Sequence, residues 1–331
     1  MHLTNKIQTR LVSASIGMGT FATATHTVGQ VFGYEDPLIA SCAAYSLRYV
    51  PCCNICFQQV GSFSQLVYSI LNSNQARDWN RIGWSVCEFC SFHLCPDCVK
   101  LENHVKFHEI LCCKGDANRR GLLVRLARLG VTVSESIPLA VDLLCKLHVE
   151  SLNFIDDYHI KLDEENKRLE CEIACKILNE LAPQVSTKLL HRIVSVFDNT
   201  NLYLEIENPS MMSDIENGLL SVQICTELEN AHTKFGFPAI FDHNLPPLPV
   251  CIGTGHYRTI ARMNHSCDPN VEWRSVNGSN RIELVAVRDI KPDEELTISY
   301  IDQSQPKETR ISKLKAIYGF TCTCNICLLE A

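Results

Sequence analysis

The feature that most constrains the fold of this chain is a series of closely spaced cysteine and histidine pairs. Each pair separates two metal-ligand residues by two or three positions, so that both side chains can turn toward one point. Two such pairs complete a tetrahedral zinc site, so four pairs predict two zinc ions. The pairs are Cys53/Cys56, Cys87/Cys90, Cys95/Cys98 and His108/Cys112. Cys52, His104 and Cys113 are alternative ligands, because each lies close to a member of these pairs.

The rest of the sequence favours thiols that are free or bound to metal over disulfides. The chain has 19 cysteines among 331 residues, but its start, MHLTNKIQTR, lacks the apolar segment of a secretory signal peptide. No uncharged apolar run approaches the ~18 residues that span a bilayer. An apolar content of 46% excludes a disordered chain, and the formal charge of −7 argues against nucleic-acid binding through bulk electrostatics. We therefore expect a soluble intracellular protein.

A second cysteine group lies near the C-terminal end of the sequence. Cys322, Cys324 and Cys327 form a C-x-C-x-x-C motif, which is one ligand short of a structural zinc site. Cys267, in the sequence NHSC, is the best candidate for the fourth ligand. Such a site would join the end of the sequence to a residue more than fifty positions upstream. It would stabilise the fold by on the order of 10 kcal/mol.

Three motifs in the last third of the chain follow one another in a distinctive order. NHSCDPN, at 264–270, precedes the strand-like segment EELTISYID, which contains Tyr300, and YGFTCTCNIC, at 318–327. This order closely resembles SET-domain lysine methyltransferases that carry a post-SET zinc motif. The pairs between 53 and 112 resemble a MYND finger. The chain is therefore similar to the SET–MYND family over nearly its whole length.

The resemblance implies how the ligand pairs combine. In MYND fingers, the first and third pairs share one zinc ion, and the second and fourth pairs share another. The implied sets are Cys53, Cys56, Cys95 and Cys98 for one site, and Cys87, Cys90, His108 and Cys112 for the other. The 30-residue gap between the first two pairs, and the spacing of the third pair, depart from the usual family pattern. With the terminal group, three structural zinc ions are expected.

The resemblance also implies an active site that binds S-adenosylmethionine. Tyr300 would be the catalytic residue, and a lysine of a histone or of another protein would receive the methyl group. The cofactor-binding residues would be Gly17, Met18, Gly19, Asn264, His265, Tyr300, Tyr318 and Phe320. The family usually has one more cofactor-contacting asparagine, for which Asn230 is a candidate. Ala261 stands where a serine is common.

Two functions are compatible with this resemblance. The first is a protein-lysine N-methyltransferase, which the presence of Tyr300 together with Asn264 and His265 favours. The second is a catalytically weak SET-fold adaptor that binds proline-rich partners through its MYND finger. We expect the protein in the nucleus, the cytoplasm or both, without a membrane partner. Many family members continue into a helical-repeat domain after the post-SET motif, so we expect a more open substrate cleft here, or a partner that completes it.

The expected fold class is α+β, with a SET β-fold of small sheets, an inserted MYND finger, a helical insertion and a post-SET zinc motif. The expected domains are the N-terminal SET half at 1–50, the finger at 51–113, the helical insertion at 114–245, the C-terminal SET half at 246–303 and the post-SET motif at 304–331.

Local patterns add detail to this outline. Alternating runs on both sides of Asn277-Gly278 predict a β-hairpin over 271–290. The segment 27–40 resembles the second strand pair of the family. Residues 114–230 look helical, and apolar residues spaced four apart predict a helix over 164–181. Within that helix, Cys171 and Cys175 are expected to be buried free thiols.

Overall fold

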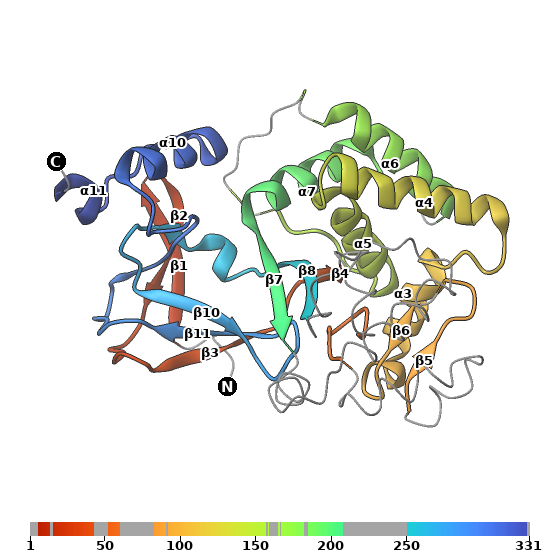
Figure 1. Cartoon of the computed structure of the whole chain (residues 1–331), viewed down its shortest axis with the longest axis horizontal. Helices are drawn as coiled ribbons and strands as arrows, with labels where there is room; N and C mark the ends of the chain where they lie inside the picture. Colours follow the sequence, from red (N-terminus) through yellow and green to blue (C-terminus); the bar gives the residue numbers. More distant parts are fainter. Residues whose placement is uncertain are drawn as a thin grey trace, which may run out of the picture.

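The computed structural model describes most of the chain. The described residues are 6–13, 16–42, 52–59, 83–90, 92–156, 158, 165, 167–181, 185–207 and 250–329. Small β-sheets and the C-terminal helices form one half of the molecule, and the remaining helices and the finger form the other half (Figure 1).

The strands are short, as expected for a fold of small sheets. They are β1 (Ile7–Ser13), β2 (Gly17–Ala22), β3 (Val31–Glu35), β4 (Ile39–Cys42), β5 (Ser85–Val86), β6 (His93–Leu94), β7 (Asn201–Glu207), β8 (Val250–His256), β9 (Asn264–His265), β10 (Val271–Ser275), β11 (Ile282–Ala286) and β12 (Glu295–Ile298). The helices are η3 (Cys98–Lys100), α3 (Glu102–Leu111), α4 (Ala117–Thr132), α5 (Ser136–Val149), α6 (Arg168–Leu181), α7 (Thr187–Thr200), η4 (Ile260–Arg262), α10 (Lys307–Tyr318) and α11 (Asn325–Leu329).

The described strands form three small sheets and a two-stranded ribbon in the finger. The strand orders are β1-β2-β12-β9, β10-β11-β3 and β4-β8-β7, with β5-β6 in the finger. The α+β class expected from the sequence is confirmed. The expected pairing within 27–40 is wrong, because β3 pairs with β11 and β4 pairs with β8. Pro37 lies between the two strands, and the Leu38 N–H already donates to the His256 carbonyl at 2.8 Å, which directs β4 onto β8.

The hairpin expected around Asn277-Gly278 is confirmed. Strands β10 and β11 are antiparallel, and both turn residues have positive φ, 52° for Asn277 and 65° for Gly278. Such a turn matches the twist of the strands that it joins.

Within the described residues, the region predicted to be helical, 114–230, also contains a strand. Residues 201–207 form strand β7, because their backbone pairs with β8 along its whole length; residues 208–230 lie outside the described part of the chain. In α6 the buried face includes Cys171, Cys175 and Leu178, whereas Leu169 is exposed. A strict four-residue spacing drifts around a helix of 3.6 residues per turn, which explains why Leu169 leaves the buried face.

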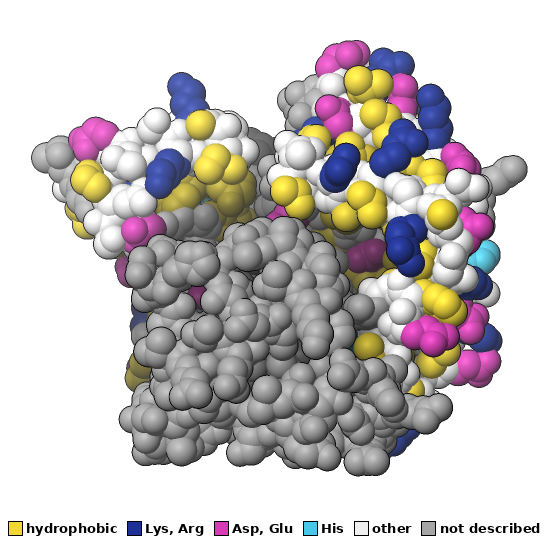
Figure 2. Space-filling model, turned by 45° about the vertical axis from the view of Figure 1, so that its right-hand side comes forward, with side chains coloured by type: hydrophobic (Ala, Val, Ile, Leu, Met, Phe, Trp, Pro, Cys, Tyr) yellow, Lys and Arg dark blue, Asp and Glu magenta, His cyan; other side chains and the backbone are white. Residues whose placement is uncertain are grey.

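Two apolar cores hold these elements in place. One lies among the helices α4 to α7, with α5 at its centre, and the other lies between the sheets. On the face drawn in Figure 2, Lys and Arg side chains are interspersed with Asp and Glu over the helical half. Among the described residues, no helix is both long and apolar enough to cross a bilayer.

Candidate active site and metal centres

Asn264 and His265 form a two-residue strand that lies beside the strand leading to Tyr300. Strand β9 pairs in parallel with β12, with Asn264 opposite Thr297 and His265 opposite Ile298. The buried Asn270 fixes this crossing, because its amide donates to the Glu295 carbonyl at 2.8 Å and accepts from the Thr297 N–H at 2.8 Å. The turn sequence DPN thereby brings the NHSC motif against the strand of the catalytic candidate.

Tyr300 lies two residues beyond the end of β12. Its hydroxyl donates to the carbonyl oxygen of Met263 at 2.6 Å, and its ring centroid lies 4.8 Å from that of Tyr318. Burial raises the pKa of Tyr300 far above its ordinary value, and Tyr318 and Glu295 add to this increase. The phenol therefore stays protonated at physiological pH.

The imidazole of His265 has polar contacts on both nitrogens. The Tyr300 N–H donates to His265 Nδ1 at 3.1 Å, and Nε2 lies 3.3 Å from the sulfur of Cys267. Burial, together with the nearby positive charge of Arg310, lowers the pKa of His265 to about 4. The ring is therefore neutral.

The Gly17-Met18-Gly19 segment begins β2 and packs against Asn264. Gly17 has a φ of 91°, in the region that favours glycine. A Cβ on Gly19 would lie 2.6 Å from Glu295 Oε1 and 3.0 Å from Asn264 Nδ2. Asn264 also donates to the Met18 carbonyl at 3.2 Å. A side chain at position 19 would therefore have to displace the side chains of Glu295, Val12 and Asn264.

These elements surround a cavity of about 200 Å³. Five of the eight cofactor-binding candidates line it: Met18, Asn264, Tyr300, Tyr318 and Phe320. Gly17, Gly19 and His265 are not among its described lining residues. Gly19 faces Asn264 and Glu295, and the ring of His265 is turned toward Tyr300 and Cys267.

Several lining residues were not identified from the sequence: Ile16, Tyr158, Asn199, Thr200 and Arg262. Ala261, which stands where the family commonly has serine, also lines the cavity. Asn199 and Thr200 end α7 in the helical insertion, and no motif marks them. Asn230, the candidate for the additional family asparagine, lies outside the described residues.

The phenol of Tyr158 is held by a buried histidine. Its oxygen lies 2.7 Å from His256 Nε2, and Thr200 Oγ1 lies 3.0 Å from His256 Nδ1. His256 is fully buried at the end of β8. The helical insertion and the sheets therefore meet at this wall of the cavity.

The structure brings twelve metal-ligand residues together in three groups of four. Within each group the ligand atoms lie within 4.8 Å of one another. The groups are Cys53, Cys56, Cys95 and Cys98; Cys87, Cys90, His108 and Cys112; and Cys267, Cys322, Cys324 and Cys327. Four thiolates, or three thiolates and one imidazole, are ordinary ligand sets for structural zinc.

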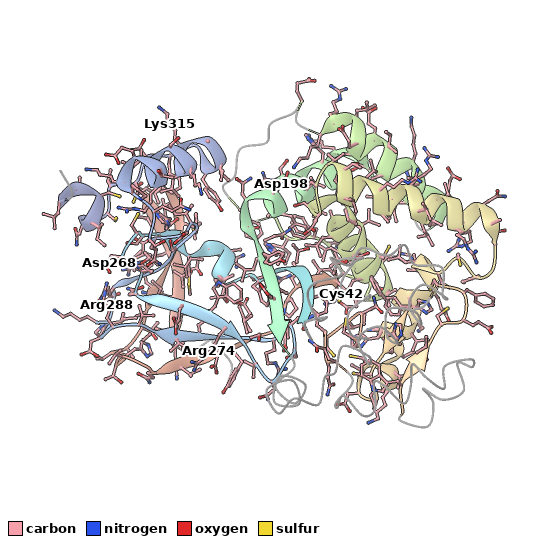
Figure 3. The ribbon with its side chains drawn as sticks, in the orientation of Figure 1. Cys42, Asp198, Asp268, Arg274, Arg288 and Lys315 are labelled. Carbon is pink, nitrogen blue, oxygen red and sulfur yellow. The ribbon has the colours of Figure 1, made fainter. Side chains whose placement is uncertain are left out.

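The alternative ligands in the finger have other surroundings. The sulfur of Cys52 lies 3.2 Å from that of Cys42, which is labelled in Figure 3. The Cys113 thiol donates to the Phe89 carbonyl at 3.2 Å. His104 belongs to none of the three groups. The geometry thus selects Cys53, Cys112 and His108 from the choices that the sequence leaves open.

The terminal group lies against the cavity. Its cysteines pack with Leu314 of α10 and with Tyr300, Tyr318 and Phe320, three of the residues that line the cavity. Figure 1 shows α10 above the end of β2, with α11 to its side near the C-terminus. A zinc ion bound by these cysteines would fix the aromatic wall of the cavity.

The comparisons with known proteins agree with this geometry. A family model described as SET domain matches residues 17–301. A SET and MYND domain-containing protein of Dictyostelium discoideum is 41% identical over 78 residues, which cover 24% of this chain and 15% of that protein. The histone-lysine N-methyltransferase ATXR2 of Arabidopsis thaliana is 31% identical over 149 residues, covering 44% and 30%. The human protein-lysine N-trimethyltransferase SMYD5 is 39% identical over 84 residues, covering 24% and 20%. The matched segments therefore span less than a third of each relative.

Proposed function

The chain belongs to the SET-domain family, and on this premise we propose that it is a protein-lysine N-methyltransferase that uses S-adenosylmethionine. The position of Tyr300 carries this proposal: the residue lines the cavity among aromatic rings, and its hydroxyl is bonded to the Met263 carbonyl. The names of the Arabidopsis and human relatives, which specify methyl transfer to lysine, support the same reaction class.

The lining of the cavity fits a sulfonium cofactor. Aromatic faces attract cations, and Tyr300, Tyr318 and Phe320 present three rings there. Met18 and Asn264 also line the cavity, and the Asn264 amide donates to the Met18 carbonyl. When bound, S-adenosylmethionine supplies a methyl group on a positively charged sulfur. We propose that these five residues hold it.

The same aromatic wall would prepare the lysine. Only the neutral amine has a lone pair with which to form the new bond to carbon. Free lysine titrates near ~10.4, so an amine that is neutral at pH 7 corresponds to about three pK units, or roughly 4 kcal/mol. Burial between aromatic rings contributes to this shift, because it disfavours the charged ammonium.

The hydroxyl of Tyr300 is arranged to orient that amine. Its proton is engaged with the Met263 carbonyl at 2.6 Å, so its oxygen lone pairs remain available to accept from an amine N–H. The raised pKa of Tyr300 keeps the phenol neutral, so it acts as a positioned acceptor rather than as a base. Such positioning aims the single lone pair of the amine at the methyl carbon.

The test is methyl transfer by the zinc-loaded full chain. The chain is incubated with radiolabelled S-adenosylmethionine and with histones or cytosolic extracts. We expect the label to appear in at least one of these proteins. Tyr300→Phe is expected to lower the transfer rate about 100-fold, the typical cost of losing one positioned hydrogen-bonding group. The cofactor Kd should change less than about threefold, because the phenyl ring remains.

Tyr203→Phe is the matched control, since Tyr203 is an exposed tyrosine of β7 and 52% of its surface is accessible. It should retain the wild-type rate. If folded protein that binds three zinc ions and the cofactor labels no protein in the panel, the proposed reaction is wrong and an adaptor role is favoured.

A further inference from the structure

We propose that His265 is a positioning residue that couples the terminal zinc site to the main chain of Tyr300. The coupling consists of two contacts on one imidazole ring, the Tyr300 N–H on Nδ1 at 3.1 Å and the Cys267 sulfur near Nε2 at 3.3 Å. The significance of Tyr300 rests on the proposed function, but the coupling itself is a property of the fold.

The donors and acceptors on this ring are determined by valence. A neutral imidazole carries one N–H and one lone pair. Because the Tyr300 N–H donates to Nδ1, that nitrogen holds the lone pair, and the ring proton is on Nε2. The Nε2–H therefore points at Cys267, where a zinc-bound thiolate is a good acceptor. Such outer hydrogen bonds commonly orient and retain metal ligands.

Arg310 supplies a second donor to the same group of cysteines. Its guanidinium is buried in α10, with Nη1 bonded to the Gln305 carbonyl at 2.6 Å and Nη2 4.0 Å from the sulfur of Cys327. Four thiolates around one Zn²⁺ have a net charge of −2, so a cation here offsets part of it. His265 and Arg310 thus approach two different ligands of the site from the protein interior.

The hydrogen-bond ladder explains why Tyr300 depends on a side chain for its position. The pairing of β9 with β12 ends at Ile298, whose carbonyl accepts from the Ser266 N–H at 3.0 Å. Beyond this point the Tyr300 N–H is bonded to the imidazole of His265 rather than to a strand carbonyl. Holding the ring through Cys267 therefore holds the backbone that carries the phenol.

The same geometry accounts for four adjacent polar residues in the sequence NHSC. Asn264 bonds to Met18, His265 to Tyr300, and Ser266 accepts from the Asp268 N–H at 3.0 Å to form the turn. Cys267 then enters the metal group. Each of the four residues therefore contacts a different part of the chain.

The first test is nitrogen NMR of the zinc-loaded wild-type protein with labelled histidine. His265 is assigned by the signal that disappears in His265→Gln. We expect an unprotonated Nδ1 and a protonated Nε2 at pH 7. A proton on Nδ1, or a doubly protonated ring, would overturn the proposal. This measurement requires no variant to be active.

The second test uses two substitutions, each of which preserves one of the two hydrogen-bonding groups of the imidazole. His265→Asn keeps an acceptor near Nδ1 but has no atom that reaches Cys267. His265→Gln keeps a donor near Nε2 but removes the acceptor for the Tyr300 N–H. Zinc release to a chromophoric chelator is followed for both full-length variants, and the two finger zincs serve as internal controls.

We expect His265→Asn to release one of the three zinc ions about 10- to 100-fold faster, the usual effect of removing an outer-shell partner. His265→Gln should release all three at wild-type rates, but should lower kcat about 10-fold with an unchanged cofactor Kd. If His265→Asn released all three zinc ions at the wild-type rates, the proposed coupling would be wrong. Absence of turnover in the wild type would instead contradict the proposed function, and would leave the zinc and NMR results to stand.

Discussion

The finger and the C-terminal group present the same types of metal ligand, but they draw those ligands from the chain in different ways. The eight finger ligands all come from residues 53–112, and one of their two groups packs in a small core of its own with Trp84 and Leu94. The terminal group joins Cys267 to 322–327 and shares its packing with residues that line the cavity. A metal site built from one segment stabilises that segment. One built from distant segments fixes a wall between them, so its loss should reach the active site.

The largest effect is expected from Cys327→Ser, which removes a buried ligand of the terminal group. The lost zinc contribution is on the order of 10 kcal/mol, so the segment after α10 should detach from the sheets. Metal analysis should show two zinc ions in place of three, and limited proteolysis should shorten the C-terminal end. Cys145→Ser changes a buried thiol of α5 that belongs to none of the groups, and it should retain three. Three zinc ions in Cys327→Ser would refute the assignment.

A smaller effect is expected at the junction of the finger with the rest of the molecule. A cavity of about 400 Å³ lies there, and Asp142 of α5 lines it together with residues of β4 and α3. Burial raises the pKa of Asp142 to about 7, although a bond to Ser41 opposes the increase. Between pH 4 and pH 7 the folded state therefore binds a proton that the unfolded state has released, so stability falls as pH rises through this range.

Asp142→Asn removes this dependence. Its free energy of unfolding should match that of the wild type near pH 4 and exceed it at pH 8, with a ceiling of about 4 kcal/mol for three pK units. Chemical denaturation across pH measures the difference. Cofactor affinity should not change, because Asp142 is not among the lining residues of the active-site cavity. If Asp142→Asn were more stable than the wild type at acid pH and less stable at pH 8, the predicted direction of the pH dependence would be wrong.

The third prediction concerns Gly19→Ala, a substitution that should distort the cavity while every zinc ligand remains in place. Gly19→Ala places a Cβ 2.6 Å from Glu295 Oε1 and from Val12 Cγ2, and the strain should cost about 1–3 kcal/mol. Displacement of Asn264 should weaken cofactor binding while three zinc ions remain. Gly121→Ala in α4 meets nothing within 4 Å and should be neutral or slightly stabilising. Loss of zinc from Gly19→Ala would show that the cavity and the metal site cannot be separated.

The sequence predicts those parts of the molecule whose partners are near in the chain or carry a recognisable motif. Ligand spacing in the finger and the turn residues Asn277-Gly278 are local signals, and NHSC with Tyr300 is a motif. The partner of Cys52 is different, because its neighbour Cys42 comes from β4 and no spacing rule joins them. The tight space around Gly19 likewise depends on the approach of Glu295 and Asn264, the latter 245 positions away.

The helical insertion shows the same limit for the site. Asn199 and Thr200 line the cavity only because α7 ends against β8, which is a result of tertiary packing. The helical pattern predicts that α7 exists but not which residues of its last turn face the cavity. Similarly, the strands β3 and β4 were evident, but their partners are set by β11 and β8 rather than by each other.

The most direct test of the central claim compares cofactor binding in two variants, each lacking one zinc site. Calorimetric titration with S-adenosylmethionine is performed on Cys90→Ser, in the finger, and on Cys327→Ser, in the terminal group, with zinc content measured on the same samples. If the terminal zinc fixes the cavity wall, Cys90→Ser should bind the cofactor within about threefold of wild type, and Cys327→Ser should lose at least about 100-fold. Equal affinity in the two variants, each with one zinc ion missing, would contradict the account.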